Sequence, residues 1–302
     1  MKKERRIITG MSDLNTQYRL GGTMKDATIS SKKTLRDHLW MWGHDPGDHD
    51  GPNGVWNIPL SQPISMAEGI KSMSIPNVCV IRSGIADDNY REQFLDVKRV
   101  AWNLSAGSNR SYHNLKNSVF SLSKILPNMT GFYLDDFFRF DDKTEFDRCS
   151  ETVPAPASLS VDEIKELHEE MIADPKRLSL SIVLYTNLLF PAIKPYMRFV
   201  DQVSLWIWDG CDINQIEENF LKYRELVPDK PTLLGIYMWD FGGKQELSVE
   251  LMKKQLDFAY ELFMANQIDG LIFHCTPLCN KNLAAVNYAR DWIQKNGDTI
   301  RT

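Results

Sequence analysis

Three short apolar runs between residues 178 and 239 decide the fold: LSLSIVLY (Leu178–Tyr185), QVSLWIW (Gln202–Trp208) and TLLGIYMW (Thr232–Trp239). Each run is almost continuously apolar and rich in β-branched or aromatic residues, which is typical of parallel strands buried on both faces. More polar segments of helical length separate the runs. This part of the chain therefore predicts a repeat of strand and helix.

The same alternation extends over most of the chain. Five further strands are predicted at Leu35–Trp42, Asn77–Ser83, Arg99–Leu104, Thr130–Asp135 and Asp269–His274. Ser160 and Glu163 have the spacing of a capping box that opens a helix. Amphipathic helices are also predicted at Leu247–Gln267, capped by Ser248, and at Asn282–Lys295.

Eight strands, each followed by a helix or a candidate helix, are what a (β/α)8 barrel requires. An open doubly wound sheet is the main alternative, but the sequence lacks the GxGxxG and GxxxxGK[ST] phosphate turns that usually accompany it. We predict a single α/β domain, a (β/α)8 TIM barrel. Two segments lie outside this repeat: an irregular N-terminal arm, residues 1–34, and a long loop insertion, residues 139–158, which we expect to lie over the barrel mouth.

Composition narrows the classes of function. The 302 residues are 43% hydrophobic and 25% charged, which is ordinary for a soluble globular protein. The formal charge of -5 disfavours a nucleic-acid partner. No apolar stretch approaches the ~20 residues of a membrane span. The basic N-terminus lacks the apolar core of a signal peptide, so we expect either a cytoplasmic protein or an exported one whose signal has been removed.

The five cysteines are scattered and contain no CxxC pair, which argues against a disulfide framework and against a structural zinc site. No cofactor is predicted. The loop Gly43–Gly51 contains two histidines and three aspartates, but HxH, HExxH and calcium-loop spacings are absent. We interpret this loop as substrate-facing, with His44 bound to a hydroxyl group, and predict no metal.

Active sites of (β/α)8 barrels lie at the carboxyl ends of the strands. The predicted strand ends carry many polar and aromatic side chains. From these we predict a substrate-binding set, namely His44, Asp45, Arg82, Asn103, Tyr185, Trp208, Tyr237, Trp239 and His274. Flat aromatic faces stack on sugar rings while polar groups bind hydroxyls, so this set favours a carbohydrate ligand. Trp40, Trp102 and Trp206 are left unassigned, because strand residues alternate between the two faces.

Four aspartates at predicted strand ends are catalytic candidates: Asp135, Asp136, Asp209 and Asp240. Glycoside hydrolysis needs two carboxyl groups flanking the scissile bond. The alternative for Asp209, which precedes Gly210, and for Asp240, which precedes Phe241, is that each caps the following helix. A catalytic role is favoured for Asp135. Burying two adjacent carboxylates on a strand costs folding free energy, which a functional role would explain.

The run Gly131-Phe132-Tyr133-Leu134-Asp135 resembles the fourth-strand end of retaining glycoside hydrolases of the α-amylase, α-glucosidase and α-galactosidase types. Similar ends occur in the family containing polygalactosaminidases. The resemblance implies that Asp135 is the nucleophile and Asp136 its neighbour. Likeness to the α-galactosidase type implies that the acid/base follows the sixth strand, where Asp209 lies.

The sequence also departs from the patterns of these families. Tyr133 stands where the α-amylase type has an arginine, and the chitinase-like DxxDxDxE motif is absent. The Asn-Glu pair of the largest barrel clan is also missing from the fourth strand. The resemblance covers five residues plus the architecture and selects no family.

The leading hypothesis is a retaining glycoside hydrolase with Asp135 as nucleophile and Asp209 as acid/base. Burial against Trp208 would raise the pKa of Asp209, as a general acid requires. Two alternatives remain: a carbohydrate-binding barrel without turnover, and a metal-dependent hydrolase or isomerase that uses His44, Asp45, Asp135 and His274.

Overall fold

Eight parallel strands close into a barrel in the computed structural model, and each strand pairs with its neighbours in chain order. The structure describes residues 33–49, 51, 54–82, 88–104, 112–138, 140 and 143–301. The strands are β1 (Leu39–His44), β2 (Asn77–Ile81), β3 (Arg99–Asn103), β4 (Met129–Leu134), β5 (Ser179–Tyr185), β6 (Gln202–Trp206), β7 (Thr232–Tyr237) and β8 (Gly270–His274). The predicted (β/α)8 fold is confirmed.

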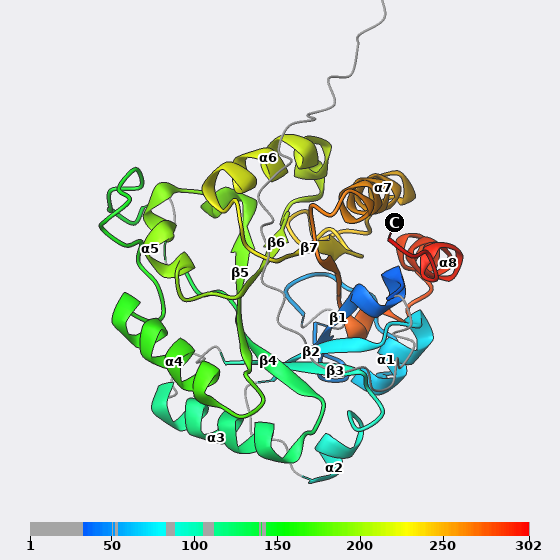
Figure 1. Ribbon diagram of the computed structural model, residues 1–302. Helices are drawn as coiled ribbons and strands as arrows, with labels where there is room; N and C mark the ends of the chain where they lie inside the picture. The colour runs from blue at the N-terminus through cyan, green and yellow to red at the C-terminus, as the bar shows by residue number, and fades with distance from the viewer. Residues whose placement is uncertain are drawn as a thin grey trace, which may run out of the picture. The chain divides into compact units, whose positions relative to one another are not determined.

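The α-helices surround the strands, as Figure 1 shows, and the described ranges contain eight of them. They are α1 (Met66–Met73), α2 (Asp88–Glu92), α3 (Tyr112–Ile125), α4 (Val161–Ala173), α5 (Lys194–Met197), α6 (Ile216–Leu226), α7 (Val249–Met264) and α8 (Ala284–Asn296). The strands pack their apolar side chains against this helical layer, so most strand residues are buried. No helix in the described ranges is long and apolar enough to cross a membrane.

The two predicted helix starts are confirmed in atomic detail. The Ser160 hydroxyl accepts a hydrogen bond from the Glu163 amide at 3.2 Å, and the Ser160 amide donates to the Glu163 carboxylate at 2.7 Å. The Ser248 hydroxyl accepts from the Leu251 amide at 3.2 Å at the start of α7. Each cap satisfies backbone amides that have no partner within the helix.

The predicted strand from Leu35 is wrong in its first four residues. Leu35–His38 form a short 3-10 helix, η1, and β1 begins only at Leu39. Asp37 explains the difference, because its carboxylate accepts a hydrogen bond from the Thr34 amide at 2.8 Å and so caps η1. Two strands also end earlier than predicted. The carboxyl ends of β6 and β7 are Trp206 and Tyr237, two residues before the predicted ends. Trp208 and Trp239 therefore lie in loops.

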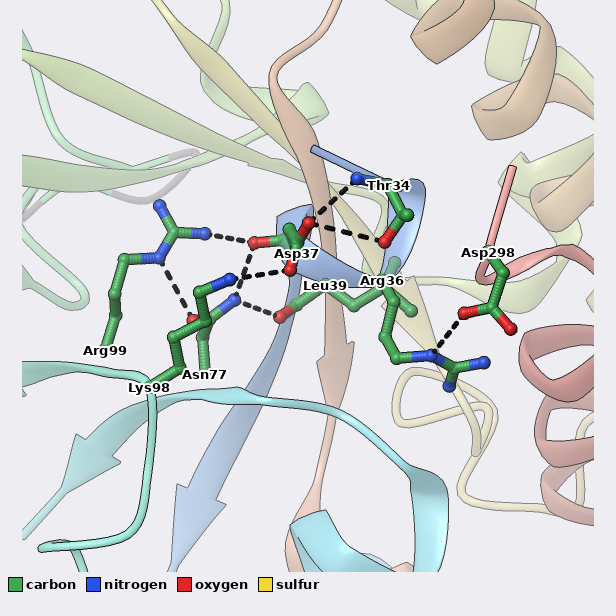
Figure 2. A network of polar contacts seen from close by, with 8 residues as sticks. All are labelled: Thr34, Arg36, Asp37, Leu39, Asn77, Lys98, Arg99 and Asp298. Atoms are coloured by element: carbon green, nitrogen blue, oxygen red, sulfur yellow. Dashed lines mark hydrogen bonds and ion pairs between the residues drawn. The ribbon is translucent and has the colours of Figure 1, made fainter. Parts of the chain in front are cut away.

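Asp37 also belongs to a polar network at the amino end of the barrel, shown in Figure 2. The buried Asn77 amide donates to the carbonyls of Asp37 and Leu39 at 3.1 and 2.7 Å, and Arg99 donates to the Asn77 side-chain oxygen at 3.0 Å. Lys98 pairs with the Asp37 carboxylate at 2.6 Å. These groups connect β1, β2 and β3 and supply one another's hydrogen-bond partners. We therefore infer that they stabilise the fold.

Residues 1–32 of the predicted N-terminal arm lie outside the described residues, as do positions 139 and 141–142 of the predicted loop insertion. The described part of that loop connects β4 to α4. A bridge between Phe138 and Ala157 joins the two ends of the loop, and the Ser158 amide donates to the Phe137 carbonyl at 2.8 Å.

Candidate active site

A cavity of about 230 Å3 opens at the carboxyl ends of the strands. Its described lining residues come from β1, β5, β6, β7 and β8 and from the loops after β1, β4, β6 and β7: Trp42, His44, His49, Trp56, Asp135, Asp136, Val183, Tyr185, Trp206, Trp208, Tyr237, Phe241 and His274. Seven of the thirteen predicted site residues meet here, namely His44, Asp135, Asp136, Tyr185, Trp208, Tyr237 and His274. Carboxylates, imidazoles and aromatic rings thus share one hollow.

Asp135 and Asp136 are the only carboxylates among the described lining residues. They follow β4, and an extended chain would turn neighbouring side chains to opposite faces. Asp136 has a positive φ of 44°, which ends the extended conformation and allows both residues to line the cavity. The Asp136 amide donates to the Asp135 carboxylate at 3.0 Å. Asp135 is half-buried and Asp136 is exposed.

Tyr185 holds the Asp136 carboxylate from the neighbouring strand. Its hydroxyl donates to Asp136 at 3.2 Å. Burial raises the pKa of Tyr185 well above its usual value, and the nearby Tyr237, Asp135 and Asp136 raise it further. The phenol therefore stays protonated and remains a hydrogen-bond donor.

Histidines form the wall opposite the two aspartates. His274 ends β8, which stands across the closed ring from β4. His44 ends β1, and its ring lies beside those of His49 and His274, with centroids 4.5 and 5.4 Å away. The His44 Nδ1 is 3.7 Å from the Asp48 carboxylate. The contact with the His44 imidazole is the main cause that lowers the pKa of Asp48.

His274 is buried, with 9% of its surface exposed, and its Nδ1 has no hydrogen-bond partner among the described residues. Burial lowers the pKa of His274 well below 6.5, and the neighbouring His44 and His49 lower it further. The imidazole is therefore neutral near pH 7. A buried polar atom without a partner is rare in proteins, and this one belongs to a residue that lines the cavity.

Aromatic rings supply the floor and the remaining walls. Gly235 makes room for Trp206, since an added Cβ there would lie 2.2 Å from the indole. Trp206 packs edge to face with Trp42 at 5.5 Å between centroids. Nearer the opening, Trp208 meets Trp56 at 5.1 Å. Aromatic rings that line a hollow together with polar groups are suited to contact with sugars.

The structure does not bring the other six predicted residues into the cavity lining: Asp45, Arg82, Asn103, Asp209, Trp239 and Asp240. Asp45 accepts from the Tyr90 hydroxyl at 2.8 Å and lies 3.6 Å from Arg82. Asn103 is buried at the end of β3. The Trp239 indole donates to the Trp56 carbonyl at 3.0 Å, so it supports a cavity wall from behind.

Asp240 organises the loops after β6 and β7. Its carboxylate accepts from the amides of Gly210 and Gly243 at 2.9 and 2.8 Å and from the Gln245 side chain at 3.1 Å. Asp209 lies three residues beyond the end of β6, and its carboxylate packs directly against Gly242. Burial, followed by the nearby Asp212 and Asp240, raises the pKa of Asp209.

Sequence reasoning did not assign His49, Trp42, Trp56 and Phe241 to the site. A signal existed for Trp42, because it precedes His44 by two residues on one strand and so shares its face. Trp56 and Phe241 are in loops, where periodicity carries no information. In the described part of the chain, no group of three or more His, Cys, Asp or Glu is arranged to hold a metal ion.

No protein-family model matches this sequence, and no curated protein matches it. The fold is similar to active domain 2 of a chitinase from Pyrococcus furiosus, with a TM-score of 0.53, 11% identity, and coverage of 88% of this chain and 98% of that one. It is also similar to a beta-glucuronidase from Bacteroides uniformis, with a TM-score of 0.53, 11% identity, and coverage of 81% of this chain and 30% of that one. These similarities establish the shared barrel fold.

Proposed function

We propose that this protein is a glycoside hydrolase that cleaves its substrate in the cavity described above. The observation that carries the proposal is the pair Asp135 and Asp136, which lies among aromatic rings and a neutral histidine at the catalytic end of a (β/α)8 barrel. The chitinase and the beta-glucuronidase with similar folds support this class of reaction.

Asp135 is assigned as the nucleophile that attacks the anomeric carbon in a retaining mechanism. In this mechanism its carboxylate forms a bond to the sugar while the bond to the leaving oxygen breaks. The resemblance of Gly131–Asp135 to the fourth-strand end of retaining enzymes supports this role. Water then attacks the sugar and releases the Asp135 carboxylate.

Asp136 is assigned as the acid/base in place of Asp209. It lines the same cavity as Asp135, whereas Asp209 packs against Gly242 outside the lining. Asp136 gives its proton to the leaving oxygen in the first step and takes one from water in the second. The Tyr185 hydroxyl, 3.2 Å away, orients the carboxylate.

His274 is assigned to a sugar hydroxyl. A hydroxyl group both donates and accepts, so it can pair with the neutral ring of His274, which lines the cavity, in either tautomer. The flat faces of the neighbouring indoles cover the apolar side of the sugar ring.

The test is kcat/KM on a panel of 2,4-dinitrophenyl glycosides and on the matching methyl glycosides, for the wild type, for Asp135→Asn and for Asp136→Asn. We expect Asp135→Asn to lose about 10³-fold or more in kcat/KM on every substrate. Asp136→Asn should lose about 10²- to 10⁴-fold on glycosides with poor leaving groups, but little on dinitrophenyl glycosides, which need no proton. Full activity of Asp135→Asn would refute the assignment.

A sugar-binding barrel without turnover is the second candidate. The specific observation in its favour is that both lining carboxylates come from one strand end, and the wall opposite them is formed by histidines. Quenching of tryptophan fluorescence by monosaccharides, combined with no hydrolysis of any dinitrophenyl glycoside, would favour this candidate over the enzyme.

A further inference from the structure

The histidine wall of the cavity contains a chain of three polar side chains. The Nδ1 atom of His44 lies 3.7 Å from the Asp48 carboxylate, and the Nε2 atoms of His44 and His49 lie 3.5 Å apart. His44 and His49 line the cavity, whereas Asp48 is not among its described lining residues. The Nδ1 edge of His44 is therefore turned toward Asp48, and the Nε2 edge toward His49 and the cavity.

The backbone of His44 is held by one buried side chain. The His44 amide donates to the Thr276 hydroxyl at 2.9 Å, and the same hydroxyl donates to the His44 carbonyl at 3.0 Å. Thr276 follows β8 and is fully buried. The pairing of β1 with β8 reaches only to Trp42 and His274, so the Thr276 side chain continues the contact between the two strands for one more step. A ring on such a fixed backbone is oriented by its two polar neighbours.

Asp48 selects one tautomer of the neutral His44 ring. A carboxylate only accepts hydrogen bonds, so it favours a proton on Nδ1, the ring nitrogen that faces it. The contact with His44 lowers the pKa of Asp48, which keeps this carboxylate ionised near pH 7. The Nε2 of His44 is then a bare acceptor. Two bare nitrogens 3.5 Å apart would repel each other, so the facing Nε2 of His49 carries a proton.

A hydroxyl group matches this arrangement. An oxygen can lie about 2.8 Å from both nitrogens, donate its own proton to the bare Nε2 of His44 and accept the proton of His49. An ether or carbonyl oxygen cannot donate, and an ammonium group cannot accept.

From this geometry we infer that His44 and His49 bind one sugar hydroxyl between them, and that Asp48 is the positioning residue that makes one ring the acceptor and the other the donor. The inference rests on the proposed function only for the identity of the ligand as a sugar. It assigns to the histidine wall the selection of a substrate with a free hydroxyl at one position, while Asp135 and Asp136 act on the glycosidic bond.

The first measurement determines the tautomer of His44 and needs no ligand. Protein labelled with 15N-histidine is studied by NMR spectroscopy at pH 8.5, and the signals of His44 are identified by their loss in His44→Gln. We expect the wild type to carry the His44 proton on Nδ1, and Asp48→Asn to shift the His44 signals toward a mixture of tautomers.

Asp257→Asn is the matched control for Asp48→Asn. The Asp257 side chain is 50% exposed, against 48% for Asp48, and it pairs with Lys253 on α7. This variant should leave the His44 signals unchanged. A His44 proton on Nε2 in the wild type, or His44 signals that do not respond to Asp48→Asn, would overturn the inference whatever the protein does to sugars.

The second measurement tests the hydroxyl. Methyl glycosides of glucose, galactose, fucose and N-acetylglucosamine, in both anomeric forms, are titrated into the labelled protein, and dissociation constants are taken from the shifts of the histidine signals. The tightest ligand is then compared with its monodeoxy analogues, each of which lacks one hydroxyl. We expect one analogue to bind the wild type about tenfold more weakly than the parent, because two polar atoms of the site lose their partner.

The same comparison in variants connects this loss to the histidine pair. In His44→Ala the parent and that analogue should bind within about twofold of each other, and in Asp48→Asn their ratio should fall to about threefold. Asp257→Asn should keep the ratio of the wild type. Each ratio compares two ligands of one variant, so a general loss of stability does not produce the expected change.

The outcomes separate the inference from the proposed function. A ratio that is the same in the wild type and in His44→Ala for every analogue would overturn the inference, even if dinitrophenyl glycosides are hydrolysed. A His44-dependent ratio without hydrolysis would support the inference and count against the enzyme. Histidine signals that respond to none of the glycosides would count against both.

Discussion

Replacing His274 with glutamine should change how the stability of the protein depends on pH. Burial holds the folded-state pKa of this imidazole well below 6.5, whereas the unfolded chain has the ordinary value of 6.5. Below about pH 6.5 the unfolded state therefore binds a proton that the folded state does not, and wild-type stability falls as the pH decreases. Between pH 8 and pH 5 the loss from this one group is about 2 kcal/mol.

Glutamine does not titrate in this range, so His274→Gln lacks this loss. The variant gives up ring contacts, such as the one with Phe241 at 4.6 Å between centroids, and at pH 8 it should be less stable than the wild type by about 1–3 kcal/mol. At pH 5 the gap should shrink by about 2 kcal/mol.

The assay is urea unfolding of both proteins at pH 5, 6, 7 and 8, followed by tryptophan fluorescence. The difference between the two free energies of unfolding largely cancels the groups that both proteins share. A difference that is the same at every pH would show that His274 has the same pKa in the folded and the unfolded protein, and would refute a histidine that burial keeps neutral.

Two further predictions concern other positions. Asp209→Asn should keep the turnover of dinitrophenyl glycosides, since Asp209 does not line the cavity, and loss of turnover would return it to the mechanism. The folded-state pKa of Asp209 is raised, so its ionised carboxylate destabilises the folded state above that pKa. The Asp209→Asn variant should therefore melt at a higher temperature than the wild type at pH 7. Near pH 3, where Asp209 is protonated, the two proteins should melt at the same temperature. Gly131→Ala should lower the free energy of unfolding, measured by urea titration, by about 1–3 kcal/mol, because the new Cβ would lie 2.3 Å from the Ser179 carbonyl oxygen on β5. An unchanged free energy of unfolding would mean that β4 and β5 can move apart at this point.

The elements that could be predicted are those whose signal is local. Apolar runs of strand length recur with helical segments between them, and caps such as Ser160 with Glu163 lie within one turn of helix, so both can be recognised without knowing the partners. The exception at Leu35–His38 is instructive. These residues precede the apolar run of β1 directly, but Asp37 caps a short helix and interacts with Asn77 and Lys98, which are remote in the sequence.

The residues that end a strand were the most reliable part of the predicted site. His44, Tyr185, Tyr237 and His274 are the last residues of their strands, and all four line the cavity. Beyond a strand end the path of the loop decides where a side chain lies. Trp208 lines the cavity two residues past β6, whereas Asp209, one residue later, packs against the neighbouring loop at Gly242.

The amino-acid sequence by itself determined the barrel, because hydrophobic periodicity and the length of each repeat depend only on near neighbours along the chain. It also determined which strand ends carry acids, imidazoles and indoles. Tertiary structure alone decided that Asp136 rather than Asp209 shares the cavity with Asp135, and that Trp56 and Phe241 complete the cavity walls. These outcomes depend on a left-handed backbone turn and on contacts between loops distant in the chain, and no local pattern encodes them.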